Sequence, residues 1–264
     1  MARDTSVISE YDLHRFARQL ILSGFDDDHQ LALLNSHIVV IGAGGLGSPL
    51  IQYLAAAGVG ALTIFDHDDV DLTNLNRQIL HGYQDIGTRK VISAKESVHR
   101  LDADLKLNLR DEDFTTDTVF DSATLICDAS DNPETRYAAN DTAHRHGIPL
   151  VFGGAVRLDG QLAVFNSGVD PSAPCYRCIF PEAADTTLVP GCSEAGILGA
   201  ITGMMGAMMA LEAIRHCLIS TAVSNPLGPG LGQDLLLVDG RFMTFDRITM
   251  KKNKECSSCG PQDG

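Results

Sequence analysis

The segment His37–Pro49, HIVVIGAGGLGSP, decides the fold of this chain. Its first five residues form a β-branched run, which is typical of a buried strand. Gly42, Gly44 and Gly47 then fit the pattern G-x-G-x-x-G. Pro49 suits the first turn of a helix, where its missing N–H needs no partner. A strand, a glycine loop and a helix in this order are typical of an α/β unit that binds phosphate at the helix N-terminus.

Strands and helices alternate outward from this loop. Further strands are predicted at 61–65, 124–127 and 149–152, and helices at 48–57, 88–101 and 134–146. This alternation predicts a Rossmann-like α/β fold, with a mainly parallel sheet and helices on both faces. Beyond it we expect a hairpin over 154–165, with its turn at Asp159-Gly160, and strands at 235–238 and 242–250. Antiparallel C-terminal strands should therefore extend the sheet.

The whole chain, 1–264, is predicted to form a single domain in three parts. Residues 1–35 are the N-terminal helical segment, 36–153 the nucleotide-binding half and 154–264 the second half. An amphipathic helix is expected over Tyr11–Gly24, with Leu13, Phe16, Ala17, Leu20 and Ile21 on one face. The uncharged stretch 195–211 is somewhat short for a membrane span of about 20 residues, so it predicts a buried helix packed on a neighbour.

Composition excludes several classes of partner. The 264 residues are 44% hydrophobic and 20% charged, with a net charge of −14 at pH 7. Such an acidic surface repels nucleic acid and anionic membranes, so neither is expected as a partner. Residues 1–10 carry no apolar core and no small-residue cleavage site. We therefore expect a cytoplasmic protein.

Charged residues downstream of the loop indicate which ligand it holds. Asp66 ends the second strand about 20 residues after the loop, where a carboxylate can bind ribose hydroxyls. Arg77 and Lys90 suit a triphosphate, and Asp131, after another strand, suits Mg²⁺. Nicotinamide dinucleotides are the commonest ligands of such loops, so an NAD-dependent oxidoreductase and a non-catalytic nucleotide-binding scaffold stay open as alternatives.

Taken together, the motifs of this chain resemble those of the MoeB/ThiF family, the bacterial relatives of ubiquitin-activating enzymes. The matching segments, in order, are Arg15–Gln19, the loop with Gly42, Gly44, Gly45 and Gly47, Asp66–Asp68, Asn74–Gln78, Lys90, Asp131-Asn132, Cys175–Cys178, Glu194–Gly196 and Cys256–Cys259. The match runs from about Leu13 to Gly260. Departures such as Asn76, where relatives usually have Gln, remove no group that the family's chemistry needs.

The resemblance implies an adenylyltransferase that uses ATP to activate the C-terminal glycine of a small ubiquitin-like sulfur-carrier protein ending in Gly-Gly. It implies that Asp66 binds ribose, that Arg77 and Lys90 bind phosphates, and that Asn74 supports them. Asp131 would hold Mg²⁺. Arg18 would reach the ATP of a partner subunit, which implies a homodimer. The second half, 154–264, would bind the carrier, for molybdenum-cofactor or thiamine-type sulfur transfer from a separate sulfur donor.

Seven cysteines in a chain expected to be cytoplasmic are not expected to form disulfides. Four of them form two C-x-x-C pairs, Cys175/Cys178 and Cys256/Cys259, which favour a closed structural zinc site over a redox dithiol. Cys192 aligns with the cysteine that bonds covalently to the carrier in ThiF-like members, although MoeB-like members adenylate without that step. Cys127 and Cys217 lie in apolar runs and are expected in the core.

Overall fold

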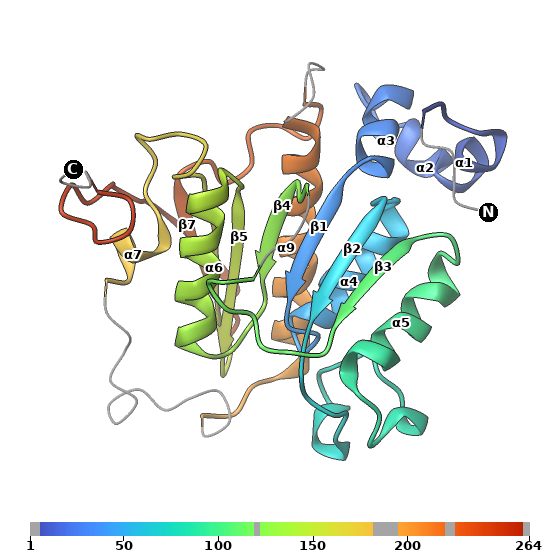
Figure 1. Ribbon diagram of the computed structural model, residues 1–264, viewed down its shortest axis with the longest axis horizontal. Helices are drawn as coiled ribbons and strands as arrows, with labels where there is room; N and C mark the ends of the chain where they lie inside the picture. The colour runs from blue at the N-terminus through green and yellow to red at the C-terminus, as the bar shows by residue number, and fades with distance from the viewer. Residues whose placement is uncertain (1–5, 119–121, 182–194, 220–224, 261–264) are drawn as a thin grey trace.

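The computed structural model describes residues 6–118, 122–181, 195–219 and 225–260, which are organised around one eight-stranded sheet (Figure 1). The strands are β1 (His37–Ile41), β2 (Ala61–Phe65), β3 (Lys106–Arg110), β4 (Leu125–Asp128), β5 (Leu150–Val156), β6 (Asp159–Phe165), β7 (Asp234–Asp239) and β8 (Thr244–Thr249). Their order in the sheet is β3-β2-β1-β4-β5-β6-β7-β8. The pairs from β3 to β5 are parallel and those from β5 to β8 antiparallel, which confirms the predicted fold class.

Helices cover both faces of this sheet, as Figure 1 shows. The described α-helices are α1 (Glu10–Arg15), α2 (Ala17–Leu20), α3 (Asp27–Leu34), α4 (Gly47–Ala57), α5 (Lys90–Leu101), α6 (Pro133–His146), α7 (Tyr176–Ile179) and α9 (Gly199–Ile219). Ile38 and Val40 of β1 pack on the side of α4 and α9, and Val39 and Ile41 pack on the side of α6. Both faces of β1 are therefore buried, which is why its sequence is apolar without alternation.

Helix α9 confirms that the uncharged stretch forms a buried helix packed on neighbours. It lies against α4 and against β5 and β6. Met205 and Met209 of α9 are fully buried, and their sulfurs lie over Gly160 and Gly153. A Cβ at Gly160 would lie 2.3 Å from the Met205 sulfur, so this close approach needs glycine in the strand.

This packing explains why the predicted hairpin turn was wrong. The hairpin forms, but its two turn residues are Arg157 and Leu158, and Asp159 and Gly160 pair within β6. Arg157 adopts the positive φ of 55° that the turn requires. Gly160 therefore makes room for the packing of α9 on the sheet and is not a turn residue.

Two other predictions need correction. The single helix expected over Tyr11–Gly24 is split into α1 and α2 at Phe16, whose backbone leaves the helical range (ψ 13°). Phe16 is buried against Gly58, whereas Leu13 and Ile21 are exposed, so the expected apolar face is only partly buried. Strand β3 was not predicted, because this edge strand alternates polar and apolar residues and none of its residues is fully buried.

Candidate functional site

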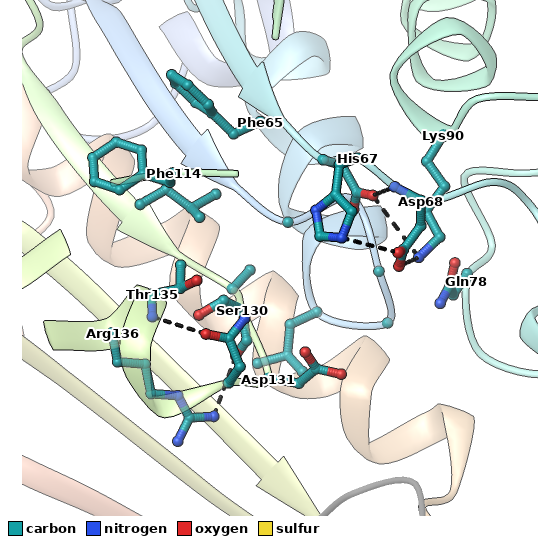
Figure 2. Close-up of a pocket in the computed structure, with 18 of the residues that line it drawn as sticks. Phe65, His67, Asp68, Gln78, Lys90, Phe114, Ser130, Asp131, Thr135 and Arg136 are labelled. Carbon is teal, nitrogen blue, oxygen red and sulfur yellow. Dashed lines mark hydrogen bonds and ion pairs between the residues drawn. The ribbon is translucent and has the colours of Figure 1, made fainter. Parts of the chain in front are cut away.

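A cleft opens at the carboxyl ends of β1, β2 and β4, where parallel sheets of this kind bind ligands (Figure 2). The predicted site residues that line it are Gly42, Gly44, Gly45, Asp66, Arg77, Lys90 and Asp131. These residues come from the glycine loop, from the end of β2, from the segment after it, from α5 and from the end of β4. Residues up to 89 positions apart in the chain therefore face one cavity.

Asp66 fixes the glycine loop to the end of β2. Its Oδ2 accepts the N–H of Ala43 at 2.8 Å, and its Oδ1 accepts the N–H of Asp68 at 3.0 Å. The N–H of Gly42 also donates to the carbonyl of Phe65, at 2.8 Å. A carboxylate oxygen has two lone pairs, so Asp66 can accept further hydrogen bonds from a ligand hydroxyl group in the cleft.

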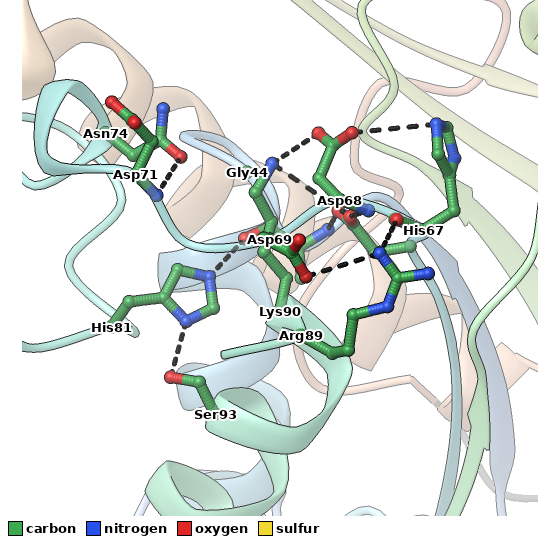
Figure 3. A network of polar contacts seen from close by, with 12 residues as sticks. Gly44, His67, Asp68, Asp69, Asp71, Asn74, His81, Arg89, Lys90 and Ser93 are labelled. Carbon is green, nitrogen blue, oxygen red and sulfur yellow. Dashed lines mark hydrogen bonds and ion pairs between the residues drawn. The ribbon is translucent and has the colours of Figure 1, made fainter. Parts of the chain in front are cut away.

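Lys90, the first residue of α5, brings a buried positive charge to the cleft. Its side chain is only 6% exposed, and its Nζ lies 2.6 Å from Oδ2 of Asp68 and 3.9 Å from Oδ1 of Asp66. Figure 3 shows this ion pair beside the glycine loop. Burial alone would raise the pKa of Asp68, but the hydrogen bond and charge of Lys90 outweigh it and lower that pKa.

A buried polar network that begins at His81 contacts the glycine loop (Figure 3). His81 bonds to the carbonyl of Ala43 through Nε2 at 3.0 Å, and to Oγ of Ser93 through Nδ1 at 2.8 Å. Because a carbonyl can only accept, Nε2 carries the hydrogen of the first bond. Oγ of Ser93 also lies 2.9 Å from Oδ2 of Asp85, and its single hydrogen can be donated either to this carboxylate or to Nδ1 of His81. Burial lowers the pKa of His81.

The opposite wall is the turn between β4 and α6. Asp128, at the end of β4, is buried and accepts both the N–H and the hydroxyl of Ser130, at 3.0 and 2.6 Å. Burial raises the pKa of Asp128. Asn132 begins α6 by accepting the N–H of Thr135 at 2.8 Å. These bonds shape the turn that presents the exposed carboxylate of Asp131 to the cleft.

Four predicted site residues lie elsewhere. Asn74 accepts the N–H of Asp71 at 3.1 Å and does not line the cleft (Figure 3). Gly47 lies behind the loop, where it contacts the backbone of Gly42. Arg18 is exposed on α2 and does not line the cleft of its own chain. Cys192 lies outside the described residues.

Several side chains that line the cleft were not predicted as site residues. Phe65 and Phe114 form an edge-to-face pair, with ring centroids 5.1 Å apart, on a different side of the cleft from Lys90 (Figure 2). Arg136 donates to the carbonyl of Ser130 at 3.2 Å and lies over a phenylalanine ring of β5. Its position one turn into α6, after the Asp-Asn pair, could have indicated it. No local pattern marks Phe114.

The four paired cysteines lie together in space, although the two pairs are far apart in sequence. The Sγ atoms of Cys175 and Cys256 lie 3.5 Å apart, and those of Cys178 and Cys259 lie 3.4 Å apart. All four lie within 4.8 Å of one another. A tetrahedral zinc ion with Zn–S bonds of about 2.3 Å requires sulfurs about 3.8 Å apart, so this cluster fits zinc closely. Four protein ligands leave no open position, which makes such a site structural.

The remaining cysteines in the described residues lie in the core. Cys127 of β4 is completely buried and Cys217 of α9 is 1% exposed, as predicted. Burial raises the pKa of both thiols, that of Cys217 to about 12, so neither is a ready nucleophile.

Comparison with known sequences gives relatives over almost the whole chain. The ThiF family model matches residues 16–258. The "Adenylyltransferase and sulfurtransferase MOCS3" of Culex quinquefasciatus is 39% identical over 96% of this chain, which spans 56% of that relative's length. The "SAMP-activating enzyme E1" of Haloferax volcanii is 39% identical over 94% of this chain and 89% of its own length. The "Sulfur carrier protein adenylyltransferase" of Thermus thermophilus is 37% identical over 95% of this chain and 92% of its own length.

Solved structures share the same fold. That of E. coli MccB with ATP matches with a TM-score of 0.77 and 20% identity, and covers 96% of this chain and 76% of that one. E. coli MccB alone matches with a TM-score of 0.79 and 19% identity, and covers 97% of this chain and 74% of that one. At this identity the likeness concerns the fold alone. Within the described ranges, none of the helices combines the length and the apolar content that crossing a bilayer requires.

Proposed function

The chain belongs to the ThiF family, and from this we propose that it uses ATP to adenylylate the C-terminal glycine of a small ubiquitin-like sulfur-carrier protein. One observation carries the proposal. The glycine loop, Asp66, Arg77, Lys90 and Asp131 all face a single cleft at the carboxyl end of the sheet. The names of the relatives from Haloferax and Thermus support the same reaction and the same kind of partner.

The chemistry asks the protein to hold two anions together. A C-terminal carboxyl group has a pKa of about 3.5, so it is already ionised at pH 7 and needs no general base. One carboxylate oxygen bonds to the α-phosphorus of ATP, and the bond from that phosphorus to the bridging oxygen of the β-phosphate breaks. Pyrophosphate leaves with the bonding electrons, and the carrier retains an acyl adenylate.

Charge placement in the cleft suits these steps. Lys90 and Arg77 are the cations that would bind phosphate oxygens, and they would stabilise the charge that passes to pyrophosphate. Arg77 donates to the carbonyl of Thr73 at 3.0 Å, which leaves further guanidinium N–H groups for phosphate. Lys90 is already paired with Asp68, so phosphate oxygens would share a cation that is held in place before ATP binds.

Asp131 is the residue that would hold Mg²⁺. Its carboxylate is exposed in the cleft, and hard divalent cations prefer such oxygen ligands. Bound there, the ion would neutralise phosphate charge. Ser130 and Asn132 on either side of Asp131 are both fixed by hydrogen bonds, so its backbone would stay in place when ATP binds.

The position of Arg18 supports a homodimer. It is a cation on α2 that does not reach the cleft of its own chain, so it is available to complete the cleft of a second copy. Two-fold symmetry would then give two equivalent sites. Sulfur would come from a separate donor protein. Cys192 would be needed only if the carrier forms a covalent bond with this chain after adenylylation.

Isotope exchange between pyrophosphate and ATP tests the proposed function. Exchange should require a carrier with an intact C-terminal glycine and should stop when that glycine is removed. Exchange with the truncated carrier would overturn the proposed acceptor. An absence of exchange with any intact carrier would favour the nucleotide-binding scaffold, and hydride transfer to NAD would favour the oxidoreductase.

A further inference from the structure

Two consecutive residues of α6 contact both cysteine pairs. Oδ1 of Asn140 accepts the N–H of Tyr176, in the first pair, at 2.8 Å, and its Nδ2 donates to Oγ of Ser258, in the second pair, at 3.2 Å. Arg177 donates to both oxygens of Asp141, from Nε at 3.0 Å and from Nη2 at 2.8 Å. Ser258 donates to Oδ1 of Asp141 at 2.8 Å. None of these bonds involves a sulfur atom.

Asp141 is the centre of this arrangement. It accepts four hydrogen bonds: two from a residue between Cys175 and Cys178, one from a residue between Cys256 and Cys259, and one from Nδ2 of Asn140 at 2.9 Å. The Arg177–Asp141 pair is bidentate, and the two side chains are only 25% and 26% exposed. The guanidinium also lies over the ring of Tyr137, 4.2 Å from its centroid. A bidentate, half-buried pair of this kind is stronger and more directional than an exposed ion pair.

We propose that Asp141 is a positioning residue for the metal site, and that it holds the two cysteine pairs together on α6 before zinc binds. The two pairs are 81 residues apart in sequence, so ordering them has an entropic cost. The hydrogen bonds of Asp141 would offset that cost when the protein folds, so that metal binding does not have to offset it. Zinc would then bind to ligands that are already gathered, and it would leave more slowly. The proposal does not depend on whether the chain is an adenylyltransferase.

Zinc release tests the proposal directly. Asp141→Asn keeps the shape of the side chain but removes its charge, and its NH2 group cannot accept a hydrogen bond, so the bidentate pair with Arg177 is lost. Loaded with zinc and mixed with a chromophoric chelator, this variant should release the metal about 10- to 100-fold faster than wild type, the usual effect of losing a partner that orients metal ligands. Asp234→Asn is the matched control, because it breaks the Arg247–Asp234 pair away from the cysteines and should release zinc at the wild-type rate.

Hydrogen exchange of the reduced, metal-free protein provides a second readout. The N–H groups of Cys256 and Gly260 donate to backbone carbonyls within the second pair's segment. They should stay protected in metal-free wild type and lose protection in metal-free Asp141→Asn. Ser258→Ala, which removes a single hydroxyl group, should give the same changes with smaller size and serves if Asp141→Asn does not fold. Wild-type release rates in both folded variants, or an unprotected second segment in metal-free wild type, would overturn the proposal.

Discussion

Substitutions at two glycines of the glycine loop should separate an effect on ATP binding from an effect on folding. A Cβ at Gly47 would lie 2.0 Å from the carbonyl oxygen of Gly42, a backbone atom that cannot rotate away. A Cβ at Gly44 would find its nearest neighbour, Nε2 of Gln78, at 3.7 Å, which is ordinary contact. Gly44 also lines the cleft and has no positive φ. The methyl group of Gly44→Ala should therefore fit the protein without bound ATP, and it would lie where phosphate would approach.

The expected magnitudes differ between the two variants. Non-bonded carbon contacts are comfortable at about 3.5 Å, so Gly47→Ala must open the loop by about 1 Å or more. Overpacking of this kind costs about 1–3 kcal/mol of folding stability. Gly44→Ala should instead stabilise the free protein by about 0.4–1 kcal/mol, because alanine restricts the unfolded chain. A phosphate displaced by about 1 Å would slow the reaction roughly 100-fold.

Thermal unfolding and calorimetric titration with ATP measure the two effects separately. Gly47→Ala should lower Tm, whereas Gly44→Ala should keep or raise Tm and weaken ATP binding. The pyrophosphate exchange rate at saturating carrier should fall in both. A folded Gly44→Ala protein that binds ATP with wild-type affinity would refute the reasoning, because the phosphates would then not lie against this loop.

Two further predictions concern charges around the cleft. Lys90→Met should destabilise the protein by about 2 kcal/mol at neutral pH, less than the loss of a fully buried pair because Asp68 is half exposed. Because Lys90 lowers the pKa of Asp68, this stabilisation is complete above the ordinary aspartate pKa and is lost as pH falls through the lowered one. Urea unfolding should therefore show the difference at neutral pH and little difference in acid. Separately, Arg18→Ala and Asp131→Ala should each abolish exchange activity, and mixing the two variants should restore about one quarter of the wild-type sites.

Each of these predictions has an outcome that contradicts it. A stability difference that persists unchanged in acid would mean that Lys90 acts through packing and not through the carboxylates. If the two inactive variants demonstrably exchange subunits and no activity returns, then Arg18 does not complete a partner's cleft, and the shared-site proposal is wrong.

The sequence predicted the parallel half of the fold well because its signals are local. Strands β1, β2 and β4 are buried on both faces, so each is an apolar run ending in a polar turn. Strand β3 lies at the exposed edge of the sheet and lacks such a run. The Asp159-Gly160 pair was misleading because its glycine makes room for α9, a contact that joins distant parts of the chain. A glycine in a turn and a glycine that makes room for a packed helix look the same in the local sequence.

The site residues divide in the same way, into those marked by local sequence signals and those placed by tertiary contacts. The loop, Asp66 and Asp131 were predicted because each follows a strand whose end marks the ligand edge of the sheet. Arg136 and Phe114 reach the cleft only through the packing of α6 and of the segment after β3. Their positions depend on tertiary contacts that no motif records. Cys175 and its partners were found because paired spacing is itself a signal of metal ligation.

The contact between α9 and the sheet bears on oxidative damage. Met205 and Met209 are fully buried, and their sulfurs fill the space that Gly160 and Gly153 leave without side chains. Conversion to the sulfoxide would add a polar oxygen to each, for which this interface has no room. Met243, by contrast, is 63% exposed. Under peroxide, Met243 should therefore be oxidised while the protein is folded, and sulfoxide at Met205 or Met209 would record the moments when α9 has separated from the sheet.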